Sequence, residues 1–448
     1  MNKREFLKVS GAAAAGTVVS RMLKAEKTLA AHRTNWAGNI EYSTDQLFIP
    51  SSVDEARETI RAASKIRALG ARHCFNRIAD STAAQISLEK LESMELNETA
   101  KTVTVGGGVR YGKLAPWLDA KGYAVHNLAS LPHVTVAGAC ATATHGSGNE
   151  NRNLSSAVEG FELITADGQL HSFSREKDGG NRFDGMVVAL GSVGVQASTT
   201  VHVVPSFQVA QKVYLDLSFD RLEHDLDAIF GSAYSVSLFT DWQQNRATQV
   251  WLKRKVEGGQ IRFEDEFHGA KAATVKVHPI LGHDATPCTE QLGVPGPWYE
   301  RLPHFKMAFT PSSGNEIQTE YFVPREHGYE AIRAVEKLKD KITPHLFITE
   351  LRTVAADDLW LSMAYRRPSL AIHFTWKPEI EAVHAVLPEI EQALAPFQPR
   401  PHWGKVFTLA PEKIDAQYPR MAEFRALAAQ LDPHGKFRNA FLDREVFG

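Results

Sequence analysis

Three apolar segments in the second half of the chain each carry two polar groups that stand two residues apart. The pairs are Gln318 with Glu320, Glu350 with Arg352, and His373 with Thr375. Residues two apart in a strand share one face of a sheet, so each segment is predicted to place both groups on the same side. Polar groups are costly to bury unless they are paired. These faces therefore either meet water, with surface ion pairs, or line a polar pocket.

A histidine follows the predicted end of a strand in the first part of the chain. His73 stands three residues after Gly70, within a predicted tight turn. Successive backbone N–H groups in such a turn can hold a phosphate or the edge of a flavin. An imidazole fixed there could be a ligand, a base or a covalent anchor. It could equally be a residue that makes only local hydrogen bonds.

A long run of small residues forms the next candidate. From Ala137 to Ser147 every residue except His145 is small. Small side chains allow a ligand to approach the backbone closely, although a tightly packed buried turn has the same composition. The chain has neither a GxGxxG fingerprint nor a P-loop lysine motif, so the common nucleotide-binding folds are not supported.

A lysine near the C-terminus follows an aromatic-glycine turn, in the sequence His402-Trp403-Gly404-Lys405. Lys405 could place a cation beside a substrate oxygen. Considered alone, it is better explained as a surface lysine.

The elements that must position these residues predict an α+β fold. A β-α-β unit is expected from a strand at 47–49, a helix over 53–66 and a strand before Gly70, with Ser52 and Glu55 at capping-box spacing. Further strands are expected at 213–217, 235–241, 249–253, 316–323, 347–354 and 371–376. Helices are expected at 112–121, 325–341, 380–394 and 421–431, and a long loop at 266–315. Strands and helices do not alternate strictly, which argues against a doubly wound sheet.

Composition limits the possible partners. The chain has 448 residues and a formal net charge of -2, so no basic excess is available for a nucleic acid. Three dispersed cysteines do not make a disulfide framework, and no cluster has the spacing of a zinc site, so no metal is predicted. No apolar run is long enough for a transmembrane helix. The oligomeric state is not indicated.

Taken together, these segments resemble the vanillyl-alcohol-oxidase superfamily of flavoproteins, in its alditol oxidase (xylitol oxidase) branch, which is related to the aldonolactone oxidases. The resemblance extends from about Asn35 to Phe441 and includes the motifs at 35–39, 105–111, 129–148, 235–242, 293–298, 402–407 and 432–437. It implies a two-domain FAD-binding fold with a substrate (cap) domain built on a mixed or antiparallel sheet flanked by helices.

The resemblance also implies roles for individual residues. His73 matches the histidine that bonds covalently to the flavin, in a motif where Gly-Ser-Gly-His-Ser is usual and Ala71, Arg72 and Cys74 depart from it. FAD contacts are expected from Ala68, Leu69, Gly70, Ala71, Arg72, His73, Cys74, Ser130, Thr135, Gly138, Thr142, Ala143, Thr144, His145, Val195, Gln196 and His402. Substrate contacts are expected from Ser130, Gln318, Glu350, Arg352, Thr375 and Lys405.

The implied reaction is oxidation of the terminal CH–OH of a polyol, with O₂ as acceptor and hydrogen peroxide as product. Arg352 and Lys405 would stabilise charge on the reacting oxygen, while Glu350 and Ser130 would hold neighbouring hydroxyls. His373 is a candidate proton acceptor. An aldonolactone oxidase or dehydrogenase that uses a quinone or cytochrome is the alternative enzyme, and a non-catalytic carbohydrate- or flavin-binding protein is the alternative of another class.

The N-terminus has the layout of an export signal. Lys3-Arg4 precedes a short apolar run from Val9 to Val19, which resembles a twin-arginine signal with Lys-Arg in place of Arg-Arg. We therefore expect a leader at 1–34 and a periplasmic protein, with a cytoplasmic protein as the alternative. The flavin domain is expected at 35–206, the substrate domain at 207–399, and a segment returning to the flavin domain at 400–448.

Deletion of residues 2–30 is expected to leave a folded, flavin-loaded protein in the cytoplasm, because the family-like sequence starts at Asn35. Changing Lys3-Arg4 to Lys-Lys is expected to block export if the signal is of the twin-arginine type. Cell fractionation followed by N-terminal sequencing measures both. Native protein found unprocessed in the cytoplasm would contradict the export hypothesis.

Overall fold

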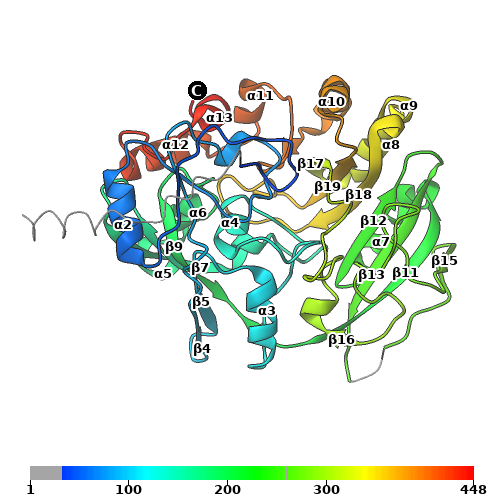
Figure 1. Cartoon of the computed structure of the whole chain (residues 1–448). Coiled ribbons are helices and arrows are strands. Elements are labelled where there is room, and N and C mark those ends of the chain that lie inside the picture. Colours follow the sequence, from blue (N-terminus) through cyan, green and yellow to red (C-terminus); the bar gives the residue numbers. More distant parts are fainter. Residues whose placement is uncertain (1–32, 259–260) are drawn as a thin grey trace, which may run out of the picture.

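The computed structural model describes residues 33–258 and 261–448, which confirm the predicted α+β, two-domain architecture. In Figure 1 the elements of the first part lie on the left and the large sheet of the second part lies on the right. The expected export-type segment falls almost entirely on residues 1–32, outside the described residues. No helix in the described part of the chain has both the length and the apolar character needed to span a bilayer.

The first part opens with the predicted β-α-β unit. Strands β1 (Leu47–Phe48), β3 (Gln85–Ile86) and β2 (Arg67–Ala68) form a parallel sheet in that order, and α2 (Val53–Ala62) connects β1 to β2. Ser52 caps α2 by accepting from the backbone N–H of Glu55. The helix ends at Ala62 rather than at Ile66, because the backbone N–H of Ile66 already donates to Lys436 in the C-terminal segment.

Arg67 fixes the end of this unit. Its guanidinium is buried and donates to the carbonyls of Ile78, Leu190, Gly191 and Phe437, at 2.6–2.9 Å. Burial lowers the pKa of Arg67 to about 10, so the side chain keeps its charge at neutral pH. One cation thus joins the β-α-β unit to two distant segments.

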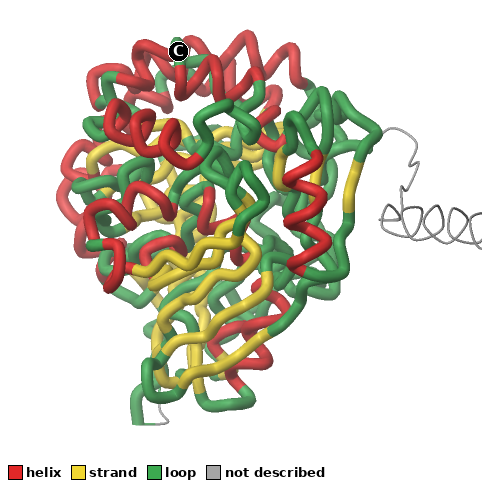
Figure 2. Tube along the Cα trace, turned by 90° about the vertical axis from the view of Figure 1, so that its left-hand side faces the viewer, coloured by secondary structure: helices red, strands yellow, loops and turns green. Residues whose placement is uncertain are grey.

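An antiparallel five-stranded sheet follows, in the order β4-β5-β9-β7-β8. Its strands are β4 (Met94–Asn97), β5 (Thr102–Gly106), β7 (Val158–Ile164), β8 (Leu170–Ser174) and β9 (Val195–His202). Around it lie α3 (Tyr111–Asp119), α4 (Val136–Ala141), α5 (Arg175–Asp178), α6 (Gly180–Val187) and the strand pair β6 (Tyr123–Ala124) and β10 (Val204–Pro205). The small-residue run therefore contains a short helix, α4, that the sequence analysis did not predict. In Figure 2 strands fill the centre and lower part of the molecule, while many helices lie along the top.

The second part is built on a ten-stranded antiparallel sheet. Its order is β14-β15-β11-β13-β12-β18-β19-β17-β20, with β16 paired to β11. The long strands are β11 (Gln208–Ser218), β13 (Arg246–Lys255), β12 (Ser235–Thr240), β18 (Leu346–Val354), β19 (Ser369–Trp376) and β17 (Ile317–Pro324). The short ones are β14 (Glu266–Phe267), β15 (Ala270–Ala272), β16 (Gly296–Pro297) and β20 (Arg400–Pro401).

Helices cover one face of this sheet. They are α7 (Leu222–Gly231), α8 (Gly328–Glu336), α9 (Lys339–Ile342) and α10 (Ile380–Leu394), seen at the upper right of Figure 1 except for α7 beside β12. Apolar residues of α7, α8 and α10 share a core with Leu351, Ile372 and Phe374 of the sheet. These sheet residues alternate with the polar pairs, so the polar groups lie on the opposite face.

The sheet register aligns the polar groups across neighbouring strands. Glu350 of β18 and Glu320 of β17 both pair with His373 of β19, and Gln318 pairs with Thr375. The polar residues of all three pairs are buried. Because the face is not solvated, the pocket interpretation holds and the surface ion-pair alternative is excluded.

Two helix predictions need correction. The helix expected at 325–341 is a 3-10 turn followed by α8 and α9, which are separated at 337–338. The helix expected at 112–121 is α3, one residue earlier at its start and two at its end. The segment 266–315 is mostly loop, as predicted, with three short strands and a 3-10 turn.

The last part of the chain leaves the large sheet after β20. It contains α11 (Pro411–Asp415), α12 (Met421–Leu431) and α13 (Ala440–Leu442). Trp403, Phe424 and Leu442 share a core with residues of the five-stranded sheet and α3. The chain thus returns to the first part and places the 402–405 turn between the two parts.

Candidate active site

One cavity lies between the polar face of the large sheet and the turn that carries His73. It is lined by all the residues predicted to contact cofactor or substrate except one. The exception is Ala143, which is fully buried and is not among the lining residues, so its contact with FAD stays a prediction. The lining residues among those predicted are Ala68, Leu69, Gly70, Ala71, Arg72, His73, Cys74, Ser130, Thr135, Gly138, Thr142, Thr144, His145, Val195, Gln196, Gln318, Glu350, Arg352, His373, Thr375, His402 and Lys405.

The turn after β2 presents backbone donors to this cavity. Among the described residues, the N–H groups of Gly70 to Cys74 have no protein acceptor, while those of Leu69 and Phe75 on either side do. Gly70 faces α4 closely, since a Cβ at either Gly70 or Gly138 would lie 2.8 Å from Thr135 Oγ1. A row of available N–H groups is the donor set that suits phosphate or flavin oxygens. The residues present therefore fit FAD.

Arg72 occupies the motif position where the family has glycine. Its φ of 64° lies in the left-handed region, which explains why glycine is usual there. The side chain is exposed, and its guanidinium lies 3.4 Å from the carbonyl of Thr34. The bulky residue is accommodated because its side chain extends toward solvent.

His73 and Cys74 differ in their readiness to act as nucleophiles. Burial, followed by the charges of His133, Arg110 and Arg72, lowers the pKa of His73 to about 3, so its ring is neutral. Burial raises the pKa of Cys74 to about 11, so its thiol stays protonated. The His73 ring is held beside Trp36, with ring centroids 4.7 Å apart.

The substrate side of the cavity is organised around two buried carboxylates. Glu320 Oε1 lies 3.1 Å from Arg352 Nη2, and Glu320 Oε2 lies 3.0 Å from Lys405 Nζ. Arg352 Nη1 also donates to Ser130 Oγ at 3.0 Å. Glu350 lies beside Arg352, with 3.5 Å between Oε1 and Nε. Lys405 is therefore not a surface lysine but an ion-paired group of the cavity.

The pKa values of both carboxyls are lowered. Burial alone would raise the pKa of Glu320, but Lys405, His145 and Arg352 hold it well below its usual range. Burial opposes the charge of Glu350 in the same way, and Arg352 and His304 lower its pKa. Both groups are carboxylates at neutral pH, which keeps the two cations compensated.

His373 is held in one tautomer. Gln318 Nε2 donates to Glu316 Oε1 at 2.6 Å, so Gln318 Oε1 accepts from His373 Nε2 at 3.1 Å. Burial and nearby cations lower the pKa of His373 well below its ordinary value. Its Nδ1 is unprotonated, and within the described chain it has no hydrogen-bond partner.

The turn at 402–405 connects the two sides of the cavity. Asn76 donates to the carbonyls of Trp403 and Lys405 at 2.8 and 2.7 Å, and the N–H of Phe75 donates to Gly404 at 2.7 Å. The segment that follows His73 is thus bonded directly to the segment that carries Lys405.

His145, Glu320 and His402 place potential metal-ligand atoms within 4.8 Å of one another. Two cations, Arg352 and Lys405, already contact Glu320 there. A metal ion at this point would meet their positive charge, so we assign the group to the ion-pair network.

Comparison of the sequence with known proteins identifies the family of this chain. Residues 44–174 match a family described as an FAD binding domain, and residues 310–445 match D-arabinono-1,4-lactone oxidase. The chain is 46% identical over 414 residues to alditol oxidase from a Streptomyces species, covering 91% of this chain and 97% of that one. The chain belongs to the vanillyl-alcohol-oxidase flavoproteins. Within this family it is related to alditol oxidase. It is an FAD-dependent oxidoreductase that acts on CH–OH groups.

More distant relatives extend the comparison. L-gulono-1,4-lactone dehydrogenase of Mycobacterium tuberculosis is 27% identical over 436 residues, covering 93% of this chain and 99% of that one. Cholesterol oxidase from Brevibacterium sterolicum has the same fold, with a TM-score of 0.73 at 15% identity, covering 93% of this flavoprotein and 96% of that chain.

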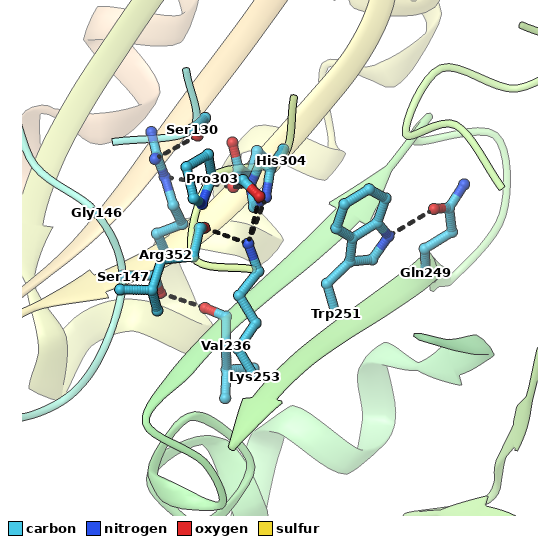
Figure 3. A network of polar contacts seen from close by, with 12 residues as sticks. Ser130, Gly146, Ser147, Val236, Gln249, Trp251, Lys253, Pro303, His304 and Arg352 are labelled. Atoms are coloured by element: carbon cyan, nitrogen blue, oxygen red, sulfur yellow. Dashed lines mark hydrogen bonds and ion pairs between the residues drawn. The ribbon is translucent and has the colours of Figure 1, made fainter. Parts of the chain in front are cut away.

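Three site residues were not assigned from the sequence. Glu320 was recognised only as a partner on a strand face, although it holds both cations. His304 and Lys253 were missed entirely, and Figure 3 shows them beside Arg352. His304 belongs to the loop at 266–315, which has no periodicity, and Lys253 lies two strands away from Glu350 in the sheet. Lys253 follows the apolar run Val250 to Leu252 but precedes two further basic residues, so its sequence context did not distinguish it from a surface lysine.

Glu320→Gln is expected to destabilise the protein by about 3–5 kcal/mol near neutral pH, because it removes the carboxylate that pairs with Lys405 and leaves Arg352 with Glu350 alone. The lowered pKa of Glu320 sets the sign of the pH dependence. Its stabilisation is present above the unfolded-state pKa of about 4.3 and is lost as the pH falls below it. The difference in the free energy of unfolding between wild type and variant should therefore become smaller as the pH falls, as measured by urea unfolding. The exposed Glu412→Gln is the control, and an equal effect of both variants would contradict the assignment.

Proposed function

We propose that this flavoprotein oxidises the terminal CH–OH of a polyol, with FAD attached to His73 and O₂ as the acceptor, giving an aldose and hydrogen peroxide. The observation that carries the proposal is the convergence of Ser130, Glu350, Arg352 and Lys405 on the cavity that also contains the His73 turn. A polyol presents several hydroxyls, and several fixed polar groups are needed to orient it.

FAD held by the His73 turn and the small-residue run would supply the redox chemistry, with the alcohol carbon as hydride donor and O₂ as the final acceptor. The protein must then stabilise charge on the substrate oxygen and remove its proton. Arg352 and Lys405 supply positive charge at the cavity. His373 Nδ1 supplies an unprotonated nitrogen whose tautomer is fixed through Gln318, so we assign it as the proton acceptor.

Glu350 and Ser130 are assigned to the hydroxyls next to the reacting one, and Thr375 to a further hydroxyl. Glu350 Oε1 faces His304 and Arg352, whereas Oε2 accepts no hydrogen bond from the described residues. A carboxylate oxygen can accept from a substrate hydroxyl, and such charge-assisted hydrogen bonds are strong.

The name of the Streptomyces relative, alditol oxidase, supports a polyol substrate. The dehydrogenase among the relatives keeps a quinone or cytochrome acceptor as the alternative to O₂. We also retain export through the twin-arginine-like leader as part of the proposal.

The test of function is anaerobic mixing of the purified flavoprotein with a series of polyols while the flavin absorbance is followed. A polyol should bleach the flavin, and readmitted O₂ should restore the colour with formation of peroxide. Lys405→Met and Arg352→Met should each slow the bleaching by about 2–4 kcal/mol of barrier, with the flavin still bound. The exposed Lys413→Met should behave as wild type. Absence of bleaching by every polyol would refute the proposal, and restoration only by a quinone or cytochrome would favour the dehydrogenase.

His73→Ala is expected to lose covalent flavin, whereas Cys74→Ser is expected to keep it. The reason is that His73 has a neutral ring nitrogen available at neutral pH, while the Cys74 thiol is protonated. Denaturing electrophoresis with flavin fluorescence, followed by mass mapping of the labelled peptide, measures the link. A fluorescent band that survives in His73→Ala would transfer the assignment to Cys74.

A further inference from the structure

Lys253 is a buried cation that the proposed chemistry does not use. It lies in β13 and is 1% exposed, although lysine is rarely buried unless it is paired. Its ammonium contacts the carbonyls of Leu302 and Pro303 and lies 3.0 Å from His304 Nδ1. Figure 3 shows the side chain reaching from its strand toward this loop. An ammonium has three N–H donors and no acceptor, so all three donors are used.

This arrangement fixes the state of His304. Because Nδ1 accepts from Lys253, the ring proton lies on Nε2, which is 2.7 Å from Glu350 Oε1. Burial and the charge of Lys253 lower the pKa of His304 to about 4, against the influence of Glu350, so the ring is neutral. The three residues therefore form a chain of cation, neutral imidazole and carboxylate.

The loop that carries His304 is anchored from both sides of the cavity. The backbone N–H groups of His304 and Phe305 donate to the carbonyl of Ser130, at 2.8 and 3.1 Å. The ring of His304 also packs edge-on against Trp251, with centroids 5.0 Å apart. The imidazole is held in place by packing as well as by its hydrogen bonds.

We propose that Lys253 and His304 are positioning residues that act through Glu350. Lys253 sets the imidazole tautomer, and the imidazole occupies Glu350 Oε1 so that Oε2 is presented to a substrate hydroxyl. The inference rests on the proposed function, since it assigns these residues to the polyol subsite of the same cavity. Lys253 does not line the cavity, and His304 acts there by holding Glu350, so both residues should govern polyol affinity more than the rate of hydride transfer.

A double-mutant cycle tests whether Lys253 acts through Glu350. Lys253→Met, Glu350→Gln and the double variant are compared for the apparent Kd of xylitol and for the limiting rate of anaerobic flavin reduction. Lys253→Met alone should raise the Kd roughly tenfold and change the limiting rate little. In the Glu350→Gln background it should change the Kd less than about twofold, because the group through which it acts is gone. An equal rise in both backgrounds would overturn the proposal.

Two matched variants separate positioning from packing. His304→Gln keeps an N–H donor for Glu350 and should retain most of the affinity, whereas His304→Phe keeps the ring packing but should lose it. Lys255→Met, in the same strand but exposed, should leave Kd and rate unchanged. Equal behaviour of His304→Gln and His304→Phe would show that the hydrogen bond to Glu350 is unimportant.

The pH profile gives a second readout. Burial lowers the pKa of Lys253 to about 7, and the groups that face it are His304, Glu350, Arg352 and Cys288. Its ammonium is therefore present below this pH and lost above it, so the Kd for xylitol should rise as the pH increases through this range. Lys253→Met should lack that step. If the Kd of Lys253→Met rose by the same factor over this pH range, the pH dependence could not be assigned to Lys253.

The same cycle measured in urea unfolding, without substrate, distinguishes failure of the inference from failure of the proposed function. Non-additive unfolding free energies, together with a wild type that no polyol reduces, would keep the link between Lys253 and Glu350 but refute the polyol role of both. Additive free energies and additive effects on Kd, in a wild type that xylitol reduces, would refute the link alone.

Discussion

The site depends on the need to compensate charges that are buried on one face of a sheet. Glu320, Glu350, Arg352 and Lys405 lie where water is largely excluded, and each would be costly there alone. The antiparallel register solves this by bringing two carboxylates against two cations on neighbouring elements. The polar groups that could bind a substrate are therefore also the groups that keep one another ionised. The helices on the opposite face of the sheet cover the apolar residues that alternate with these polar groups along the strands.

Much of this could be predicted from the sequence because a strand alternates between its two faces. That rule was sufficient to pair Glu350 with Arg352 and His373 with Thr375, and the structure places all four on one cavity. The α+β class was predictable for a similar reason, as the helices at 380–394 and 421–431 coincide with α10 and α12. Local patterns are informative wherever the interaction they describe is local.

What could not be predicted depends on contacts between distant segments. Glu320 pairs with Lys405, which lies 85 positions later in the chain. His304 lies in a loop without periodicity, and its contact with Glu350 could not be read from the local sequence. The C-terminal end of α2 and the interruption between α8 and α9 were also missed, because tertiary contacts override helix propensity there. The backbone conformation of Arg72 is another example, since its side-chain type gives no sign of a left-handed turn.

The hydrogen bonds from Asn76 and Phe75 to the 402–405 turn have a consequence for redesign of this enzyme. The segment that follows His73 and the segment that carries Lys405 share one backbone junction, so they cannot be exchanged as independent modules. A library that varies the 402–405 turn to change substrate preference would also sample cofactor loading. Conversely, grafting the turn from a relative should be done together with residues 70–76, as one unit. The cofactor-binding and substrate-binding parts therefore cannot be separated at this boundary without breaking these hydrogen bonds.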